Sequence, residues 1–133
     1  MAVYHVKEKE TIVPLFAGWQ ETFIWSCLQN CMGEAYTDNL KNPQSAEIML
    51  GDFCFLAGNV NHELLCNKPA NHYSEFIIMI PQNKEWEKAI ELMFQKKAFR
   101  RMRIRGLFSG RRIYAGIIPV MRTIIQMDWV LLF

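Results

Sequence analysis

The chain has 133 residues, of which 51% are apolar and 21% are charged, and its formal net charge is +2. This length and composition suit one folded unit with a real core and exclude a chain that is disordered throughout. The opening residues, MAVYHVKEKE, lack the pattern of a signal peptide, and the four cysteines are interpreted as reduced thiols, so a cytoplasmic location is expected.

The first predicted element is a helix over Thr11–Met32. Pro14 suits its first turn, and Gly33 suits the position just past its end. Apolar side chains recur in this stretch at steps of three and four residues, which is the period of a helix with one buried face. The residues in this stripe are Ile12, Phe16, Trp19, Phe23, Cys27 and Cys31.

Residues 34–45 are polar and contain a proline, which predicts a loop. Ala46–Leu50 and Phe53–Leu56 are short apolar runs separated by Gly51-Asp52, a pair that tolerates the backbone angles of a tight turn. The pattern therefore predicts a β-hairpin, which Ala57-Gly58-Asn59 ends.

The second half of the body predicts a strand followed by a helix. Tyr73–Ile80 is almost continuously apolar, as in a strand buried on both faces, and Pro81 follows it. Asn83 is placed to cap a helix, on which Trp86, Ala89, Ile90 and Met93 fall on one face. The predicted fold class is therefore α+β (or α/β), a small sheet with covering helices. Residues 60–72 give no clear prediction.

The charge changes sharply near residue 97. Residues 1–97 contain eight lysines, no arginine and twelve acids, a net charge of −4, whereas residues 98–133 contain seven arginines, no lysine and one acid, a net charge of +6. We therefore predict two parts, an α/β segment over 1–97 and an atypical arginine-rich, apolar tail over 98–133. A shift of reading frame would explain the switch from lysine to arginine. An ordinary basic element and a functional tail are the alternatives.

The tail contains a strand-like alternation over Met102–Arg105 and two apolar stretches, Ile113–Met121 and Thr123–Phe133. Arg122 and Asp128 interrupt these stretches, which disfavours a membrane span. Arginines interleaved with aromatic side chains are able to bind nucleic acid, but no known nucleic-acid motif is visible, so neither partner is predicted. These residues are Arg100, Arg101, Arg103, Arg105, Arg111 and Arg112, with Phe99, Phe108 and Tyr114.

Two further groups of residues have the side-chain types of chemical sites. Cys27, Cys31, His62 and Cys66 have the residue types of a zinc site, but they lack tight Cys-x2-Cys turns and the first two lie on the apolar stripe, which favours buried thiols. Ser74 or Cys54 with His72 and Asp52 supplies a nucleophile and a base, but no spacing supports the set. We predict no catalytic, cofactor-binding or metal-binding residue in this chain.

The run Gly33–Asn59, GEAYTDNLKNPQSAEIMLGDFCFLAGN, resembles the N-terminal region of a GNAT-type N-acetyltransferase family that includes zwittermicin A resistance proteins. The resemblance covers about residues 10–95, including IPQNKEWEKAIE. It implies a longer plan, in which an N-terminal α/β segment precedes a core containing a strand, a Gln/Arg-x-x-Gly-x-Gly/Ala loop and a helix. The N–H groups of that loop and the start of that helix cradle the pyrophosphate of acetyl-CoA.

The nearest match to that loop in this chain is Arg103–Phe108, where Phe108 stands in place of a small residue. No functional residue carries over, and acetyl-CoA is implied by the resemblance alone. The expected function is a truncated N-acetyltransferase of a small amine that is inactive on its own. The alternatives are a non-catalytic module that pairs with itself or with a missing acetyltransferase core, and a basic-tail protein that binds anionic lipid or nucleic acid.

Overall fold

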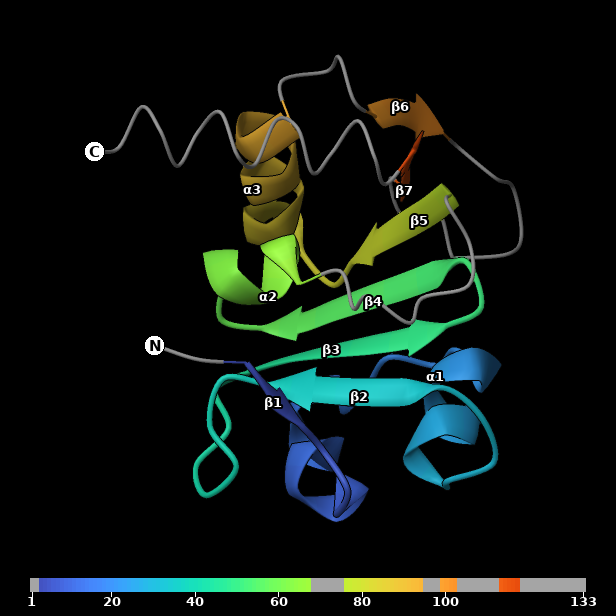
Figure 1. The fold of residues 1–133 in the computed structure, drawn as a ribbon, viewed down its shortest axis with the longest axis vertical. Helices are drawn as coiled ribbons and strands as arrows, with labels where there is room; N and C mark the ends of the chain where they lie inside the picture. The colour runs from blue at the N-terminus through green and yellow to red at the C-terminus, as the bar shows by residue number, and fades with distance from the viewer. Residues whose placement is uncertain (1–2, 68–75, 95–98, 103–112, 118–133) are drawn as a thin grey trace.

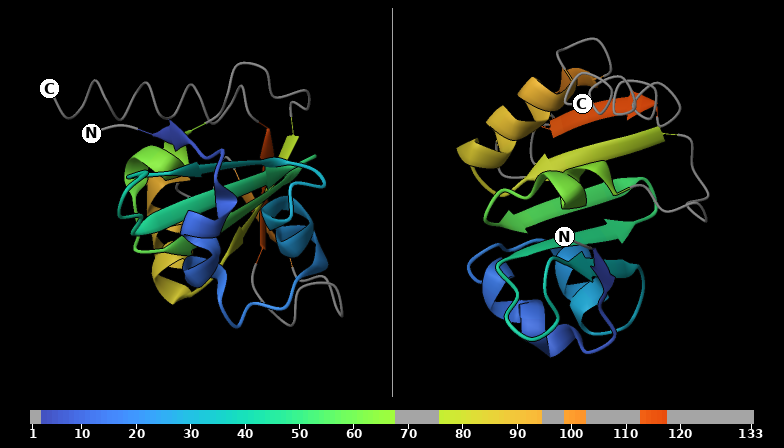
Figure 2. Two further views of the ribbon diagram at one scale, coloured as in Figure 1. Left: turned by 90° about the horizontal axis from the view of Figure 1, so that it is seen from below. Right: turned by 60° about the vertical axis from the view of Figure 1, so that its left-hand side comes forward.

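The computed structural model describes residues 3–67, 76–94, 99–102 and 113–117 (Figure 1). They form a seven-stranded sheet in the order β1-β2-β3-β4-β5-β7-β6, so that β1 and β6 lie at opposite edges (Figure 2). The predicted class, a sheet with covering helices, is confirmed. The strands are β1 (Tyr4–His5), β2 (Glu34–Thr37), β3 (Ser45–Leu50), β4 (Phe53–Gly58), β5 (Phe76–Pro81), β6 (Phe99–Met102) and β7 (Ile113–Ile117).

The predicted hairpin is confirmed as β3 and β4, which pair antiparallel from Ser45↔Gly58 to Leu50↔Phe53. Gly51 in the turn has φ +58°, a conformation that glycine adopts without steric cost. Every side chain of β3 is buried, and so are the four central side chains of β4. The hairpin therefore lies in the middle of the sheet with both faces covered.

β5 confirms the predicted strand at Tyr73–Ile80, although its described part begins at Phe76 and includes Pro81. It pairs parallel with β4, and a short helix, α2 (His62–Cys66), lies in the connection between them. β5 is followed by α3 (Lys84–Phe94), where Asn83 Oδ1 accepts a hydrogen bond from the N–H of Trp86 at 3.1 Å. The predicted cap is thus confirmed.

The prediction of one helix over Thr11–Met32 is wrong. The segment contains a 3-10 helix, η1 (Lys9–Phe16), and a separate α-helix, α1 (Thr22–Leu28). Gly18, which follows η1, has φ +81°, so the chain leaves the helical conformation at this point. Both helices still bury apolar side chains against the same part of the core, which is why the helical period continues across the break.

The prediction of a loop over residues 34–45 is wrong in its first part, because β2 occupies Glu34–Thr37 and pairs antiparallel with both β1 and β3. Ala35 and Thr37 are fully buried, and Glu34 is exposed. Residues 38–44 do form a loop, and Ser45 begins β3. Asp38 Oδ1 accepts hydrogen bonds from the N–H groups of Gln44 and Ser45 at 3.0 and 3.1 Å.

Two hydrophobic clusters lie on the two faces of the sheet. The first contains side chains of η1 and α1 together with Ile48 and Phe55, and the second contains side chains of α2 and α3 together with Met49 and Leu56. Successive strand residues alternate between the clusters, as the two-residue period of a strand requires. The helices of the N-terminal part and those of the later part therefore cover opposite faces.

Two strands, β6 and β7, come from the predicted tail over 98–133, and β7 inserts between β5 and β6. Ile113, Tyr114 and Ala115 are buried. Of the predicted strand over Met102–Arg105, only Met102 is among the described residues, and the stretch Thr123–Phe133 lies entirely outside them. The division at residue 97 and the frame shift stay predictions. No described helix is both long and apolar enough to cross a membrane.

Candidate functional site at the ends of strands β4 and β5

β4 and β5 are the one parallel pair among the described strands, and each is followed by a helix. In sheets with parallel strands, ligands bind outside the carboxyl ends of the strands, where the connections to the next helices diverge. The carboxyl ends here are Gly58 and Pro81, and the residues just beyond them are therefore the candidate functional site.

Gly58 is the turning point between β4 and α2. Its φ is +81°, its N–H donates to Oε1 of Gln82 at 3.0 Å, and its carbonyl accepts from Nε1 of Trp86 at 2.9 Å. The next N–H, that of Asn59, donates to the carbonyl of Gln44 at 2.8 Å. These two amides of the turn are therefore used within the protein.

Gln82 follows β5 and closes this end of the sheet. Its N–H donates to the carbonyl of Leu56 at 3.0 Å, which extends the pairing of β4 and β5. Its side-chain Nε2 donates to the carbonyl of Leu15 at 2.7 Å, while its Oε1 accepts from Gly58. One side chain thus joins η1 and β4 to the link between β5 and α3.

Backbone also fills the space beside Gly58. A Cβ atom at this position would lie 2.3 Å from the carbonyl oxygen of Gln44 and 3.0 Å from Cα of Ser45. Glycine is therefore required here for a close approach of two backbone segments, and the approaching group is the protein's own chain.

A buried carboxylate lies on the face of the sheet that carries the second cluster. Glu47 of β3 is fully buried, and it accepts hydrogen bonds from Nδ2 of Asn67 at 2.8 Å and from Sγ of Cys54 at 3.3 Å. Burial raises the pKa of the nearby Tyr36 hydroxyl, and the charges of Glu34 and Glu47 raise it further. These two hydrogen bonds to Glu47 join β3, β4 and the residue just after α2, which is a structural role.

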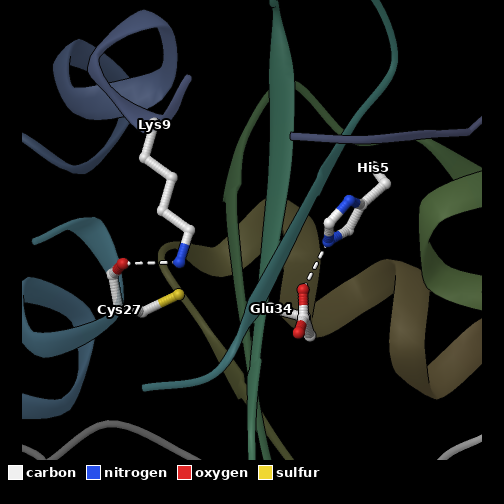
Figure 3. Close-up of polar contacts among 4 residues, drawn as sticks. All are labelled: His5, Lys9, Cys27 and Glu34. Carbon is white, nitrogen blue, oxygen red and sulfur yellow. Dashed lines mark hydrogen bonds and ion pairs between the residues drawn. The ribbon is translucent and has the colours of Figure 1, made fainter. Parts of the chain in front are cut away.

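A second polar group lies between η1 and α1 (Figure 3). Lys9 is only 6% exposed, its Nζ donates to the carbonyl of Cys27 at 2.7 Å, and it lies beside the Cys27 thiol. Burial raises the pKa of that thiol, and the Lys9 ammonium partly offsets the shift. The carbonyl belongs to the last turn of α1, where a cation is stabilised by the helix dipole. The imidazole Nε2 of His5 and the carboxylate of Glu34 form a separate, exposed polar contact.

The residues weighed for zinc are not gathered by the fold. Cys27 is buried in α1, Cys31 is exposed just after it, and His62 and Cys66 lie at the two ends of α2 on the other face. In the part of the chain that the structure describes, no three His, Cys, Asp or Glu side chains are grouped to hold a metal ion.

The other residues weighed for function have mixed outcomes. Ser74 and His72 lie outside the described residues, and Cys54 is buried against Glu47. Arg100 and Arg101 lie in β6, while the loop-like Arg103–Phe108 and the remaining arginines fall outside the described ranges. Tyr114 is in the core, and its hydroxyl donates to Glu91 at 2.8 Å.

Sequence reasoning missed Gly58 and Gln82 as a pair. In the sequence, Ala57-Gly58-Asn59 indicates only the end of a hairpin, and Gln82, between Pro81 and the cap Asn83, matches no motif. The signal in the sequence for this turn is the order of its elements, in which a buried strand is followed by a glycine and then by a helix cap. The cap is Asn61, whose Oδ1 accepts a hydrogen bond from the N–H of Leu64 at 3.1 Å.

Comparison with known proteins identifies the family. The model of the family described as GNAT acetyltransferase matches residues 13–110. The structure is also similar to that of a GCN5-related N-acetyltransferase-like protein from Streptococcus suis 89/1591, with 32% sequence identity and a TM-score of 0.58. The similarity covers 74% of this chain and 42% of that one, so this chain spans less than half of its solved relative.

The comparison with curated proteins gave no match. The closer likeness to zwittermicin A resistance proteins stays a prediction. The family match begins in η1 and continues beyond β6, so it includes the β4–β5 pair and its carboxyl end. On this match and the solved relative, the chain belongs to the GNAT acetyltransferase family.

Proposed function

We propose that this chain is a non-catalytic domain of a GNAT acetyltransferase, a scaffold that does not itself bind acetyl-CoA. Membership of the family implies acetyl-CoA as the cofactor of the intact enzymes. The proposal therefore concerns this chain alone.

The observation that carries the proposal is the internal use of the donors at the β4–α2 turn. An acetyl-CoA loop must offer free backbone N–H groups to the pyrophosphate, with glycines that let the phosphates approach. Here the N–H groups of Gly58 and Asn59 donate to Gln82 and Gln44, and the backbone of Gln44 fills the space beside Gly58. Among the described residues, this turn does not fit the pyrophosphate.

Charge at the turn supports the same conclusion. Glu63 lies in the first turn of α2, where its carboxylate repels an approaching phosphate. Two features of the site therefore disfavour the cofactor, since the donors are occupied and the nearest charged side chain on the helix is an acid.

The test is a calorimetric titration of the purified chain with acetyl-CoA at neutral pH. We expect no saturable binding with a Kd below about 1 mM, because the amides of the turn would have to exchange existing hydrogen bonds for the ligand. A longer acetyltransferase of the family, titrated under the same conditions, is the positive control. Binding of acetyl-CoA at micromolar Kd would contradict the proposal.

A second candidate function is pairing with an acetyltransferase core, and the partial coverage of the solved relative favours it. More than half of that protein has no counterpart in the matched part of this chain. If the domain contacts such a core, the purified chain should form a homodimer or bind a separately expressed core in size-exclusion chromatography with light scattering. A monomer that does not bind the core at about 100 μM, far above the Kd of specific complexes, argues against pairing.

A further inference from the structure

Gln82 joins three segments that are distant in sequence. Its side chain accepts from Gly58 N–H at 3.0 Å and donates to the Leu15 carbonyl at 2.7 Å, and its own N–H donates to Leu56 at 3.0 Å. These contacts reach 24 residues back to β4 and 67 residues back to η1.

We propose that the Gln82 side chain is a strap that closes the carboxyl end of the β4–β5 pair and couples the opening of this end to η1. Both ends of the amide are used, so rotation of the side chain breaks two hydrogen bonds at once. It then leaves Gly58 without its acceptor and the Leu15 carbonyl without its side-chain donor.

The position of the strap makes local opening feasible. Gln82, Gly58 and Leu15 are each half-buried, so water can replace the amide without global unfolding. The neighbouring core side chains Leu56, Ile80 and Trp86 are fully buried and keep the sheet assembled. The strap therefore governs access to the Gly58 N–H while the core remains folded.

Hydrogen exchange of single amides, followed by NMR on the whole chain, tests this coupling. Gln82→Ala removes both halves of the strap, and Gln82→Glu keeps an acceptor for Gly58 but removes the donor to Leu15. The Gly58 amide reports the β4 end, and the amide of Ala17, which donates to Pro14, reports η1. The amide of Ile78, which donates to Asp52 at the other end of β5, is the control.

With Gln82→Ala, we expect exchange at Gly58 and Ala17 to become about tenfold faster, because each region loses a hydrogen bond, while Ile78 changes little. With Gln82→Glu, we expect faster exchange at Ala17 and unchanged or slower exchange at Gly58. Unchanged protection of Gly58 in Gln82→Ala would overturn the proposal, and so would equal acceleration at Ile78, which indicates a global loss of stability.

The proposal for Gln82 rests on hydrogen bonds within this chain. It builds on the proposed function, because it identifies the side chain that occupies the Gly58 N–H. The two are tested separately. Acetyl-CoA binding by the unmodified chain would remove the proposed function, whereas the exchange pattern of the two Gln82 variants decides the strap alone.

Discussion

Gly58→Ala is expected to destabilise the fold by about 3 kcal/mol or more, a large part of the stability of a small domain. The residue has φ +81°, and a methyl group on it would lie 2.3 Å from the Gln44 carbonyl oxygen. The obstacle is backbone, so relief requires the β2–β3 loop to move away and to lose the Asn59 N–H bond at 2.8 Å. Urea unfolding followed by tryptophan fluorescence measures the change.

Gly18→Ala is the matched control, because Gly18 has the same φ of +81° but no atom within 4 Å of its added Cβ. We expect this variant to lower the free energy of unfolding by about 1 kcal/mol, because only the left-handed backbone conformation is unfavourable for alanine. The difference between the two variants then measures the steric closure at the β4–α2 turn. If both variants lose the same free energy of unfolding, the backbone of Gln44 does not block the space beside Gly58. That result would weaken the proposed function.

Residues 11–32 show the limit of periodicity as a signal. Ile12 and Phe16 in η1 and Ile24 and Cys27 in α1 pack into one cluster, so the apolar spacing resembles that of a single helix. Hydrophobic period reports the direction in which side chains point, and two short helices on one core share that direction. Gly18 was the local mark of the break, and a lone glycine inside a helical pattern is weak evidence.

β2 was missed for a different reason. Its residues, EAYT, are exposed or half-buried at two positions and fully buried at two, which a short window does not separate from a polar loop. By contrast, β3, β4 and β5 were predictable, because both of their faces are covered and their apolar runs are nearly continuous. A strand buried on both faces is a nearly continuous apolar run and is easily predicted, whereas a strand near the edge of the sheet contains polar residues and is not.

The candidate site was out of reach from sequence because its contacts are long-range. Gln82 meets Gly58 and Leu15 through the pairing of β4 with β5 and the packing of η1 on the sheet, neither of which has a local signature. The family resemblance, by contrast, was recoverable, since it rests on an ordered stretch of residues. It gave the family and the general class of fold, but the hydrogen bonds that close the turn required the structure.

Trp86→Ala is the second change with a large expected effect, a loss of about 3–5 kcal/mol. Trp86 is fully buried between α3 and the sheet, in the cluster that contains Leu56, Met79 and Tyr114. Truncation removes this packing and also leaves the Gly58 carbonyl without the indole N–H at 2.9 Å. Urea unfolding followed by circular dichroism gives the free energy without relying on the tryptophan that is removed.

Trp25→Ala is the matched control, because the Trp25 indole also donates to a carbonyl, that of Trp19, at 2.9 Å, but the side chain is only partly buried. The loss of stability in Trp25→Ala should be smaller, since the energetic cost of a cavity grows with the volume left empty.

Trp86→Phe keeps most of the apolar volume and removes the N–H, so it should lower the free energy of unfolding by about 1–2 kcal/mol. If Trp86→Phe costs as much as Trp86→Ala, the hydrogen bond to Gly58 dominates over packing. The turn beyond β4 would then be held shut mainly by polar contacts from the start of α3, with Gln82 and Trp86 acting on the N–H and carbonyl of the same glycine.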